Sequence, residues 1–352
     1  MWYAVVVFFR NLFFDLGLLR QQSPGITTIG IGNLACGGTG KTPHVEYLLH
    51  LLADQHNTAM LSRGYRRESS GFQIDDGTHD SSLLGDEAAM VANKYPNVTV
   101  AVCKKRLEGI KKLQEKVAGL QLVVLDDSYQ HRFIRPALNI LLTDYSHPFF
   151  DDHILPFGNL RESKRGRSRA NIIIVSKSPE KIDPITRHNI TAAINARNYQ
   201  KVFFSYIKYG DLMPLFEGET CKVTDFEDIL CVTGIANPKP LHDYLSRSVH
   251  LQTIVHGDHY QYHLHDIQTM LKQLDQLPSD RRAIVITEKD AARLRSSPHA
   301  DLLREVPIYS IAIEVAFHDN GSYTFDSEIR SIVKENIYFQ ESLQSSHFVS
   351  KP

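Results

Sequence analysis

The residues best suited to chemistry in this chain form one glycine-rich run: Gly37, Gly38, Thr39, Gly40, Lys41 and Thr42. The run follows an apolar segment at residues 26–31 and precedes a segment with helical spacing. Glycines let backbone N–H groups turn toward phosphate oxygens, a lysine reaches the terminal phosphates, and a threonine hydroxyl binds Mg²⁺. The run therefore predicts a phosphate-binding P-loop, although Ala35 stands where the usual pattern has its first glycine.

Two acidic pairs are candidates for metal binding or proton transfer. Asp126 and Asp127 follow four apolar residues at 122–125, as in a Walker B strand, although acids at a strand end can also cap the next turn. Asp86 and Glu87 stand where a helix is expected to begin. Spacing alone favours N-capping by Asp86 over a catalytic role.

Two other segments carry polar groups. His256, Asp258 and His259 follow an expected strand, and a histidine next to an aspartate can bind a metal, act as a general base or be a plain loop residue. Residues 155–169 concentrate positive charge. That segment could bind phosphate or an anionic membrane surface, or form a solvated loop.

Composition limits the classes of protein to consider. The chain has 352 residues, which favours about two domains. Its formal net charge of −1 and pI near 7.0 argue against a general nucleic-acid-binding protein. Its four cysteines are scattered without a C-x-x-C pair, so neither a disulfide framework nor a zinc site is expected, and the chain has the cysteine usage of a reduced cytosolic protein.

The N-terminal segment is unusually apolar. Residues 1–9 are wholly apolar, and Arg10, Asn11 and Asp15 interrupt the otherwise apolar residues up to position 19. The charges disfavour a spanning helix, and no signal-peptide pattern is present. The three polar residues gather on one side of a helical wheel, which favours a helix lying in the membrane interface. A helix buried against the domain behind it is the alternative.

Short apolar segments alternate with helix-length segments along the chain, which predicts an α/β fold with a mainly parallel sheet. We expect a P-loop NTPase-like N-terminal α/β/α domain and a second, smaller α/β/α domain. The expected division is a membrane-interface helix at residues 1–20, a P-loop domain at 21–200, an extended hinge at 201–220, and a C-terminal α/β domain at 221–352.

Taken in order, these motifs resemble the tetraacyldisaccharide 4′-kinase family, whose members phosphorylate the lipid A disaccharide precursor at the cytoplasmic face of the bacterial inner membrane. The resemblance spans most of the chain. It is carried by residues 32–34 and 37–43, 62–65, 85–87, 126–127 with 130–132, 155–162, 257–259 and 287–290. Two of these depart mildly from the family pattern: Ser128 and Tyr129 replace a Gly-Phe pair, and His256 and Gly257 replace a Phe-Pro pair.

The resemblance implies ATP and Mg²⁺ as cofactors and a lipid A disaccharide precursor as substrate. It also implies that the domain at 21–200 is an ATP-binding kinase domain and that the C-terminal domain at 221–352 closes over the substrate. It implies that Asp86 is the base for the sugar 4′-hydroxyl with His259 as its partner, and that Glu87 and Thr42 hold Mg²⁺. Further implied roles are support of metal and nucleotide by Asp126 and Asp127, and phosphate contacts by Arg63 and Arg66. We expect an anionic membrane surface as a partner, peripheral or monotopic attachment, no nucleic acid and no obligate protein partner.

Two other classes of protein share a P-loop. A membrane-associated regulatory GTPase normally has an Asn-Lys-x-Asp loop, whereas Ser176, Lys177, Ser178 and Pro179 follow the corresponding strand here, with no acid to bind guanine. A soluble small-molecule kinase or ligase would not need the apolar N-terminus.

Overall fold

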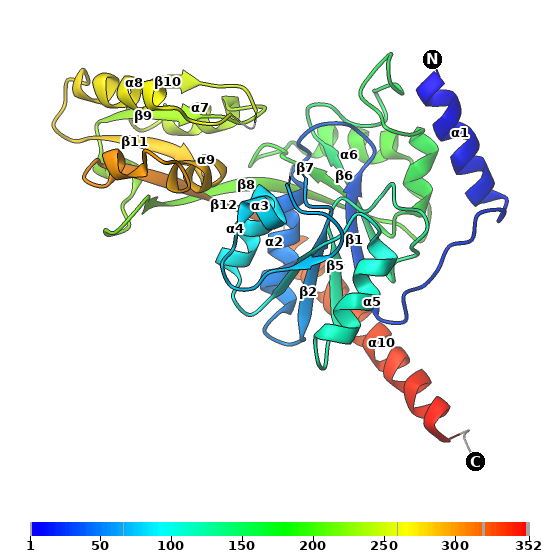
Figure 1. Cartoon of the computed structure of the whole chain (residues 1–352). Helices are drawn as coiled ribbons and strands as arrows, with labels where there is room; N and C mark the ends of the chain where they lie inside the picture. Colours follow the sequence, from blue (N-terminus) through cyan, green and yellow to red (C-terminus); the bar gives the residue numbers. More distant parts are fainter. Residues whose placement is uncertain (1, 66, 259, 319–320, 350–352) are drawn as a thin grey trace. The chain divides into compact units, whose positions relative to one another are not determined.

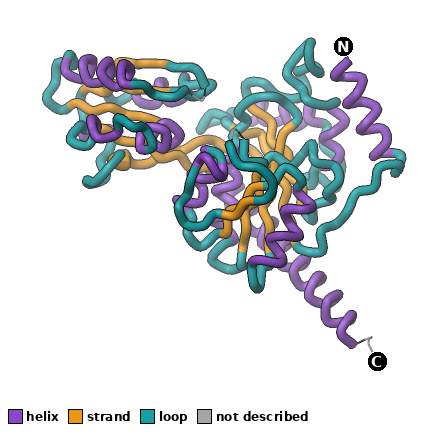
Figure 2. Tube along the Cα trace, in the orientation of Figure 1, coloured by secondary structure: helices purple, strands orange, loops and turns teal. Residues whose placement is uncertain are grey.

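A computed structural model describes residues 2–65, 67–258, 260–318 and 321–349 of the chain. The chain forms two compact units, one of residues Met1–Ile207 and Val315–Pro352 and one of residues Lys208–Glu314. Each unit consists of a sheet with helices packed on it (Figures 1 and 2).

The sheet of the first unit has the strand order β8-β7-β6-β1-β5-β2-β4-β3. Neighbouring strands are parallel, except that β3 runs antiparallel to β4. The strands are β1 (Thr27–Asn33), β2 (Thr58–Ser62), β3 (Gln73–Ile74), β4 (Thr99–Val102), β5 (Leu122–Leu125), β6 (Leu138–Asp144), β7 (Ile172–Ser176) and β8 (Lys201–Pro214).

Helices cover both faces of this sheet, because its strands are apolar on both sides. Val124 of β5 packs in the cluster that contains α2, α4 and α10, whereas its neighbour Val123 packs in the cluster that contains α5. The predicted layered α/β fold with a mainly parallel sheet is therefore confirmed. The helices are α1 (Trp2–Asp15), α2 (Lys41–Leu52), α3 (Ser81–Leu84), α4 (Asp86–Lys94), α5 (Arg106–Lys116), α6 (Pro184–Ile194) and α10 (Gly321–Val349), with a 3₁₀ helix at Lys164–Arg169.

The second unit has a parallel sheet in the order β10-β9-β11-β12. Helices α8 and α9 pack in one core cluster, and α7 packs in another. Its elements are β9 (Asp228–Thr233), α7 (Lys239–Leu245), β10 (His250–Val255), α8 (Leu264–Asp275), β11 (Arg282–Thr287), α9 (Glu288–Arg295) and β12 (Ile308–Phe317), with 3₁₀ turns at Val223–Asp225 and Ala300–Leu303.

The end of the chain belongs to the first unit, which differs from the expected division at residues 221–352. Strands β8 and β12 both carry the chain between the units, and α10 follows β12. Phe325 of α10 is buried and stacks on Phe317 at a centroid distance of 4.3 Å, with Phe203 at 5.3 Å. These aromatic contacts pack the C-terminal helix against the first sheet. No local pattern in the sequence predicts them.

Candidate active site

Parallel strand register gathers the motifs of the first unit at one edge of its sheet. Leu125, the last residue of β5, pairs with Gly30 of β1 on one side and with Leu61 of β2 on the other. The loops after these three strands therefore emerge next to one another. Loops at the carboxyl ends of parallel strands form the usual ligand site of α/β sheets.

The glycine-rich run lies between the end of β1 and the start of α2, as predicted. Gly37 and Gly40 have φ angles of 110° and 79°, a region that glycine enters without steric cost. Asn33 donates a hydrogen bond to Thr39 Oγ1 at 2.9 Å and so ties the loop to the strand. Lys41 is the first residue of α2, so the positive end of the helix dipole and the lysine amine meet at this loop.

Asp127 connects the glycine-rich loop to a distant segment. Its carboxylate lies 3.5 Å from Lys41 Nζ and accepts hydrogen bonds from Arg161 at 3.2 and 3.1 Å. Burial works to raise the pKa of Asp127, but the two cations outweigh it and hold the pKa below its ordinary value. Asp127 also has a left-handed φ of 45°, a conformation that costs energy outside glycine and is concentrated at functional sites.

Asp126 has a different environment although it is the adjacent residue. It is only 3% exposed, and within the described residues its Oδ1 atom has no hydrogen-bond partner. Burial, followed by the nearby negative charges of Glu87 and Asp127, raises its pKa to about 6. Arg106 donates to the Asp126 carbonyl at 3.0 Å, so the cation stabilises the backbone there. Its other oxygen, Oδ2, accepts a hydrogen bond from Ser62 Oγ at 3.4 Å. A buried carboxylate with one oxygen left without a partner among the described residues is suited to receive a cation.

Asp86 and Glu87 form the first turn of α4, and the N-cap position before them is Gly85. The capping role that spacing favoured for Asp86 therefore does not match the position it occupies. Gly85 has a φ of 84°, and a Cβ on it would lie 2.6 Å from the carbonyl oxygen of Tyr65. This close approach brings the loop after β2 against the start of α4.

The remaining predicted residues lie in loops or outside the described residues. Arg63 is exposed in the loop after β2, and Arg66 lies outside the described residues. In the second unit, Asp258 is exposed in the loop after β10, and His259 also lies outside the described residues. His256 stacks on Tyr260 at a centroid distance of 4.1 Å.

Several of the positively charged side chains at residues 155–169 bind partners within the first unit. Arg161 binds Asp127, and Arg169 binds the fully buried Glu162 at 2.8 Å. Arg167 donates to the Asn195 carbonyl. The sequence pattern pointed to this segment but not to Arg161 as a site residue, and the one available signal for Arg161 was its position in the family motif.

Helix α1 directs its polar side chains toward other segments of the first unit. Arg10 donates to the Gln130 carbonyl at 3.2 Å, Asn11 to Glu162 at 3.2 Å, and Asp15 pairs with Arg132 at 2.7 Å. The exposed large side chains of the helix are apolar or aromatic: Trp2, Tyr3, Val5, Val6, Phe8, Phe9 and Phe13. Among the described residues, no helix combines the length and the apolar character needed to cross a membrane.

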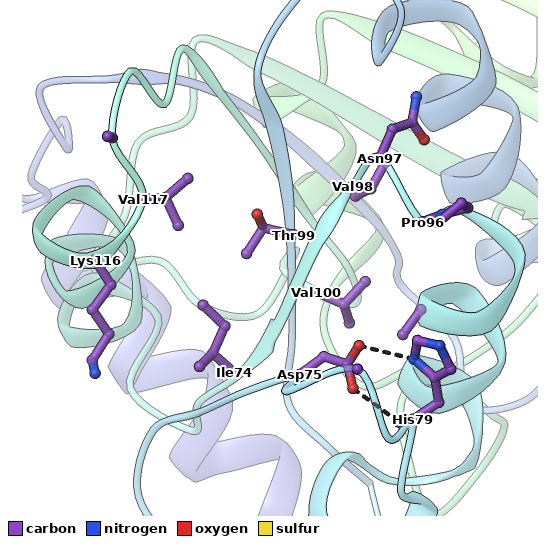
Figure 3. A pocket seen from close by; sticks show the side chains of 13 residues that line it. Ile74, Asp75, His79, Pro96, Asn97, Val98, Thr99, Val100, Lys116 and Val117 are labelled. Atoms are coloured by element: carbon purple, nitrogen blue, oxygen red, sulfur yellow. Dashed lines mark hydrogen bonds and ion pairs between the residues drawn. The ribbon is translucent and has the colours of Figure 1, made fainter.

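A cavity of about 690 Å³ lies elsewhere in the first unit (Figure 3). It is lined by Val98 and Thr99 at the start of β4 and by Asp75 and His79 beyond the end of β3. Because β3 is antiparallel to β4, these segments share the sheet edge opposite the glycine-rich loop. The Asp75–His79 pair, 2.9 Å apart, is part of this lining, and the lining includes none of the candidate active-site residues, so the cavity is separate from that site.

The fold and the loop chemistry define a nucleotide-binding α/β protein of the P-loop kinase type. The family model described as Tetraacyldisaccharide-1-P 4′-kinase matches residues 1–333, and the chain belongs to that family. The Tetraacyldisaccharide 4′-kinase of Bacteroides thetaiotaomicron is 40% identical over 347 residues, which cover 95% of this chain and 91% of that protein. The Phocaeicola vulgatus protein of the same name is 37% identical, with coverages of 95% and 93%.

A solved structure is similar over nearly the whole chain. It is the "apo" form of LpxK from Aquifex aeolicus in complex with ATP, with a TM-score of 0.72 and 25% sequence identity. The match covers 94% of this chain and 96% of that one. The membership of this family does not favour the GTPase alternative.

The raised pKa of Asp126 predicts a pH-dependent cost to stability. Its folded pKa of about 6 exceeds the ordinary value of 3.8, so the folded state holds the extra proton between these values and loses stability as pH rises through about 6. Asp126→Asn removes that cost. Without nucleotide or metal, we expect the variant to have a higher thermal midpoint than the parent at pH 8, and the difference to vanish near pH 4.

The matched control is Asp275→Asn, since that side chain is 79% exposed and its variant should follow the parent at every pH. A parent that is more stable than Asp126→Asn throughout this range would contradict the raised pKa of this buried carboxylate.

Proposed function

We propose that this protein transfers the γ-phosphate of ATP to the 4′-hydroxyl of a tetraacyldisaccharide 1-phosphate. Its membership of the kinase family supports the reaction. The observation that carries the proposal is the joining of Lys41, Asp127 and Arg161 at the glycine-rich loop, since a transferring phosphoryl group needs cations held in position. A hydroxyl acceptor then needs a group to take its proton.

Asp127 holds the two cations before nucleotide arrives. Lys41 Nζ and the Arg161 guanidinium both contact its carboxylate, which keeps them pointed into the same region. A triphosphate that enters the loop offers them an anion of higher charge. Asp127 thus orients Lys41 toward the β- and γ-phosphates and neutralises the site in its absence.

The residues present fit a Mg²⁺ ion. Asp126 offers a buried carboxylate oxygen without a partner among the described residues, and the charge of Glu87 acts on it. Thr42 is 5% exposed at the start of α2. All three supply the oxygen donors that Mg²⁺ prefers, together with waters and phosphates. When bound, the ion neutralises charge on the transferring phosphates. Asp126, Glu87 and Thr42 would hold it.

Asp86 is proposed as the general base. It lies beside Glu87 in the first turn of α4. Its carboxylate would accept the proton of the 4′-hydroxyl as that oxygen bonds to the γ-phosphorus and the bond to ADP breaks. His259 would share that proton, and Arg63 and Arg66 would bind phosphate groups. The family resemblance supports these roles.

The protein is proposed to act at the cytoplasmic face of the bacterial inner membrane as a peripheral or monotopic protein. The support is the apolar exposed side of α1, whose polar side is already hydrogen-bonded to the first unit. Trp2 is 83% exposed and Val6 is 63% exposed, so burying them in acyl chains removes apolar area from water. An anionic membrane surface is the proposed partner.

The reaction is tested with radiolabelled ATP and tetraacyldisaccharide 1-phosphate in detergent micelles. Lys41→Ala should lower turnover about 10²- to 10³-fold, because the electrostatic contact it removes acts on the developing charge. Lys208→Ala, in the other unit, is the control and should match the parent. A Lys41→Ala enzyme with turnover within a few-fold of the parent would remove the basis of the P-loop assignment.

Asp86 and His259 should behave as one functional group. A positioned base contributes about 10²- to 10⁴-fold, so Asp86→Ala and His259→Ala should each reduce kcat strongly with ATP affinity retained. The double variant should be little worse than the less active single variant, because residues that act together are not additive. If the two losses multiply, the residues act independently. If Asp86→Asn loses thermal stability but keeps turnover, its role is structural.

Membrane attachment is tested by cosedimentation with anionic vesicles. The variant Trp2→Ser/Val6→Ser/Phe9→Ser changes only exposed side chains of α1 and should lose most of its vesicle binding and show a higher KM for lipid. The KM for ATP should not change. Tyr338→Ser, on the exposed side of α10, is the control, since Tyr338 is also a large aromatic side chain and is 75% exposed. Unchanged vesicle binding by the α1 variant would place the attachment elsewhere.

A further inference from the structure

Three consecutive carbonyl groups of the glycine-rich loop are bound from the outside by side chains. Lys177 Nζ donates to the Gly38 carbonyl. Ser176 Oγ donates to the Thr39 carbonyl at 2.8 Å. His44 Nδ1 lies 2.7 Å from the Gly40 carbonyl, which can only accept, so the proton is on Nδ1. His44 Nε2 then accepts from Ser205 Oγ at 2.9 Å.

This outer set of donors determines where the loop amides point. In a trans peptide the carbonyl of one residue and the N–H of the next point in opposite directions. Binding the Thr39 and Gly40 carbonyls on the outside therefore turns the N–H groups of Gly40 and Lys41 to the inside. Inward N–H groups at a helix start are the anion-binding element of such loops.

Lys177 is the charged member of this set and is held in an unfavourable backbone conformation. It follows β7 directly and has a φ of 55°, which costs energy for a residue with a side chain. Its amine also binds Asp144 Oδ2 at 3.1 Å. Asp144 is the last residue of β6 and pairs in register with Ser176, so the sheet itself sets the position of the amine.

The charge of Lys177 has a second local effect. Burial, and after it the positive charge of Lys177, lowers the pKa of His44 to about 4. His44 is therefore neutral at pH 7 and keeps the tautomer that donates to the Gly40 carbonyl.

The N–H in the same peptide as the Gly38 carbonyl, that of Thr39, donates to the Gly37 carbonyl at 3.2 Å, so the bond from Lys177 fixes the backbone before Gly40. We propose that Lys177 is a positioning residue for nucleotide binding, which binds both the Gly38 carbonyl and Asp144 and so holds the glycine-rich loop in the conformation that presents the Gly40 and Lys41 amides. The inference rests on the assignment of the glycine-rich loop as the ATP site. The amine acts through the loop backbone, in contrast to Lys41, which reaches phosphate itself.

The test uses Lys177→Gly in the full-length protein. Glycine adopts the left-handed conformation without strain, so the change removes the amine but not the backbone geometry. A hydrogen bond from a charged group is worth roughly tenfold or more in an equilibrium constant. We expect a KM and a Kd for ATP at least about tenfold higher, an unchanged KM for lipid, and a thermal midpoint equal to or above that of the parent.

Two companion variants sharpen the test. Lys177→Arg keeps the charge and should retain more ATP affinity than Lys177→Gly. Asn195→Gly is the matched control, because Asn195 also has a left-handed φ, of 50°, is exposed, and ends α6. It should bind ATP like the parent. Should Lys177→Gly fold poorly, Lys177→Asn tolerates the same backbone and replaces it.

The outcomes separate this inference from the assignment on which it rests. A parent that does not bind ATP, or one whose Lys41→Ala variant keeps its turnover, defeats the assignment of the loop. A parent that binds ATP, together with a Lys177→Gly variant of unchanged ATP affinity, defeats the role of Lys177 alone. Equal losses in ATP affinity, lipid KM and thermal midpoint would also defeat it, because they indicate general structural damage.

Discussion

The parallel pairing of β1, β2, β5, β6 and β7 is the constraint on which the site depends. It places the carboxyl ends of five strands at one edge, where polar residues at or just after the strand ends come within reach of the glycine-rich loop. Asn33 ties the loop, Asp127 binds its lysine and Ser176 binds its carbonyl. A register shift of one residue in β5 or β7 would turn these side chains to the other face.

The adjacent carboxylates Asp126 and Asp127 show how neighbours in sequence acquire opposite electrostatic character. Asp127 contacts Lys41 and Arg161, which keep its pKa low. Asp126 is buried near the charge of Glu87, and its pKa rises to about 6. Asp127 is paired with cations and holds them in position, whereas Asp126 is a buried carboxyl group suited to binding a cation. Functional sites often hold such groups at a cost to stability.

Local pattern was enough to predict the strands, the glycine-rich loop and the acids after β5, because each depends on a short run of residue types. It could not predict Arg161 or Lys177, which reach the site only through tertiary contacts between segments far apart in the sequence. It also favoured capping for Asp86, since an acid beside a helix start resembles a cap until the backbone shows Gly85 in that position. The packing of α10 on the first sheet depends on contacts between aromatic side chains, and no local sequence pattern predicted it.

The polar side of α1 has a consequence for which substitutions its sequence can accept. On an ordinary surface helix the polar positions face water and exchange freely, while the apolar ones are fixed by the core. Here Arg10, Asn11 and Asp15 each have a specific partner elsewhere in the first unit, and most apolar positions face outward, whereas Phe14 is buried against Phe133. Variation should therefore be reversed along this helix, with the exposed apolar residues interchangeable among themselves and the three polar residues held constant by the loops they bind.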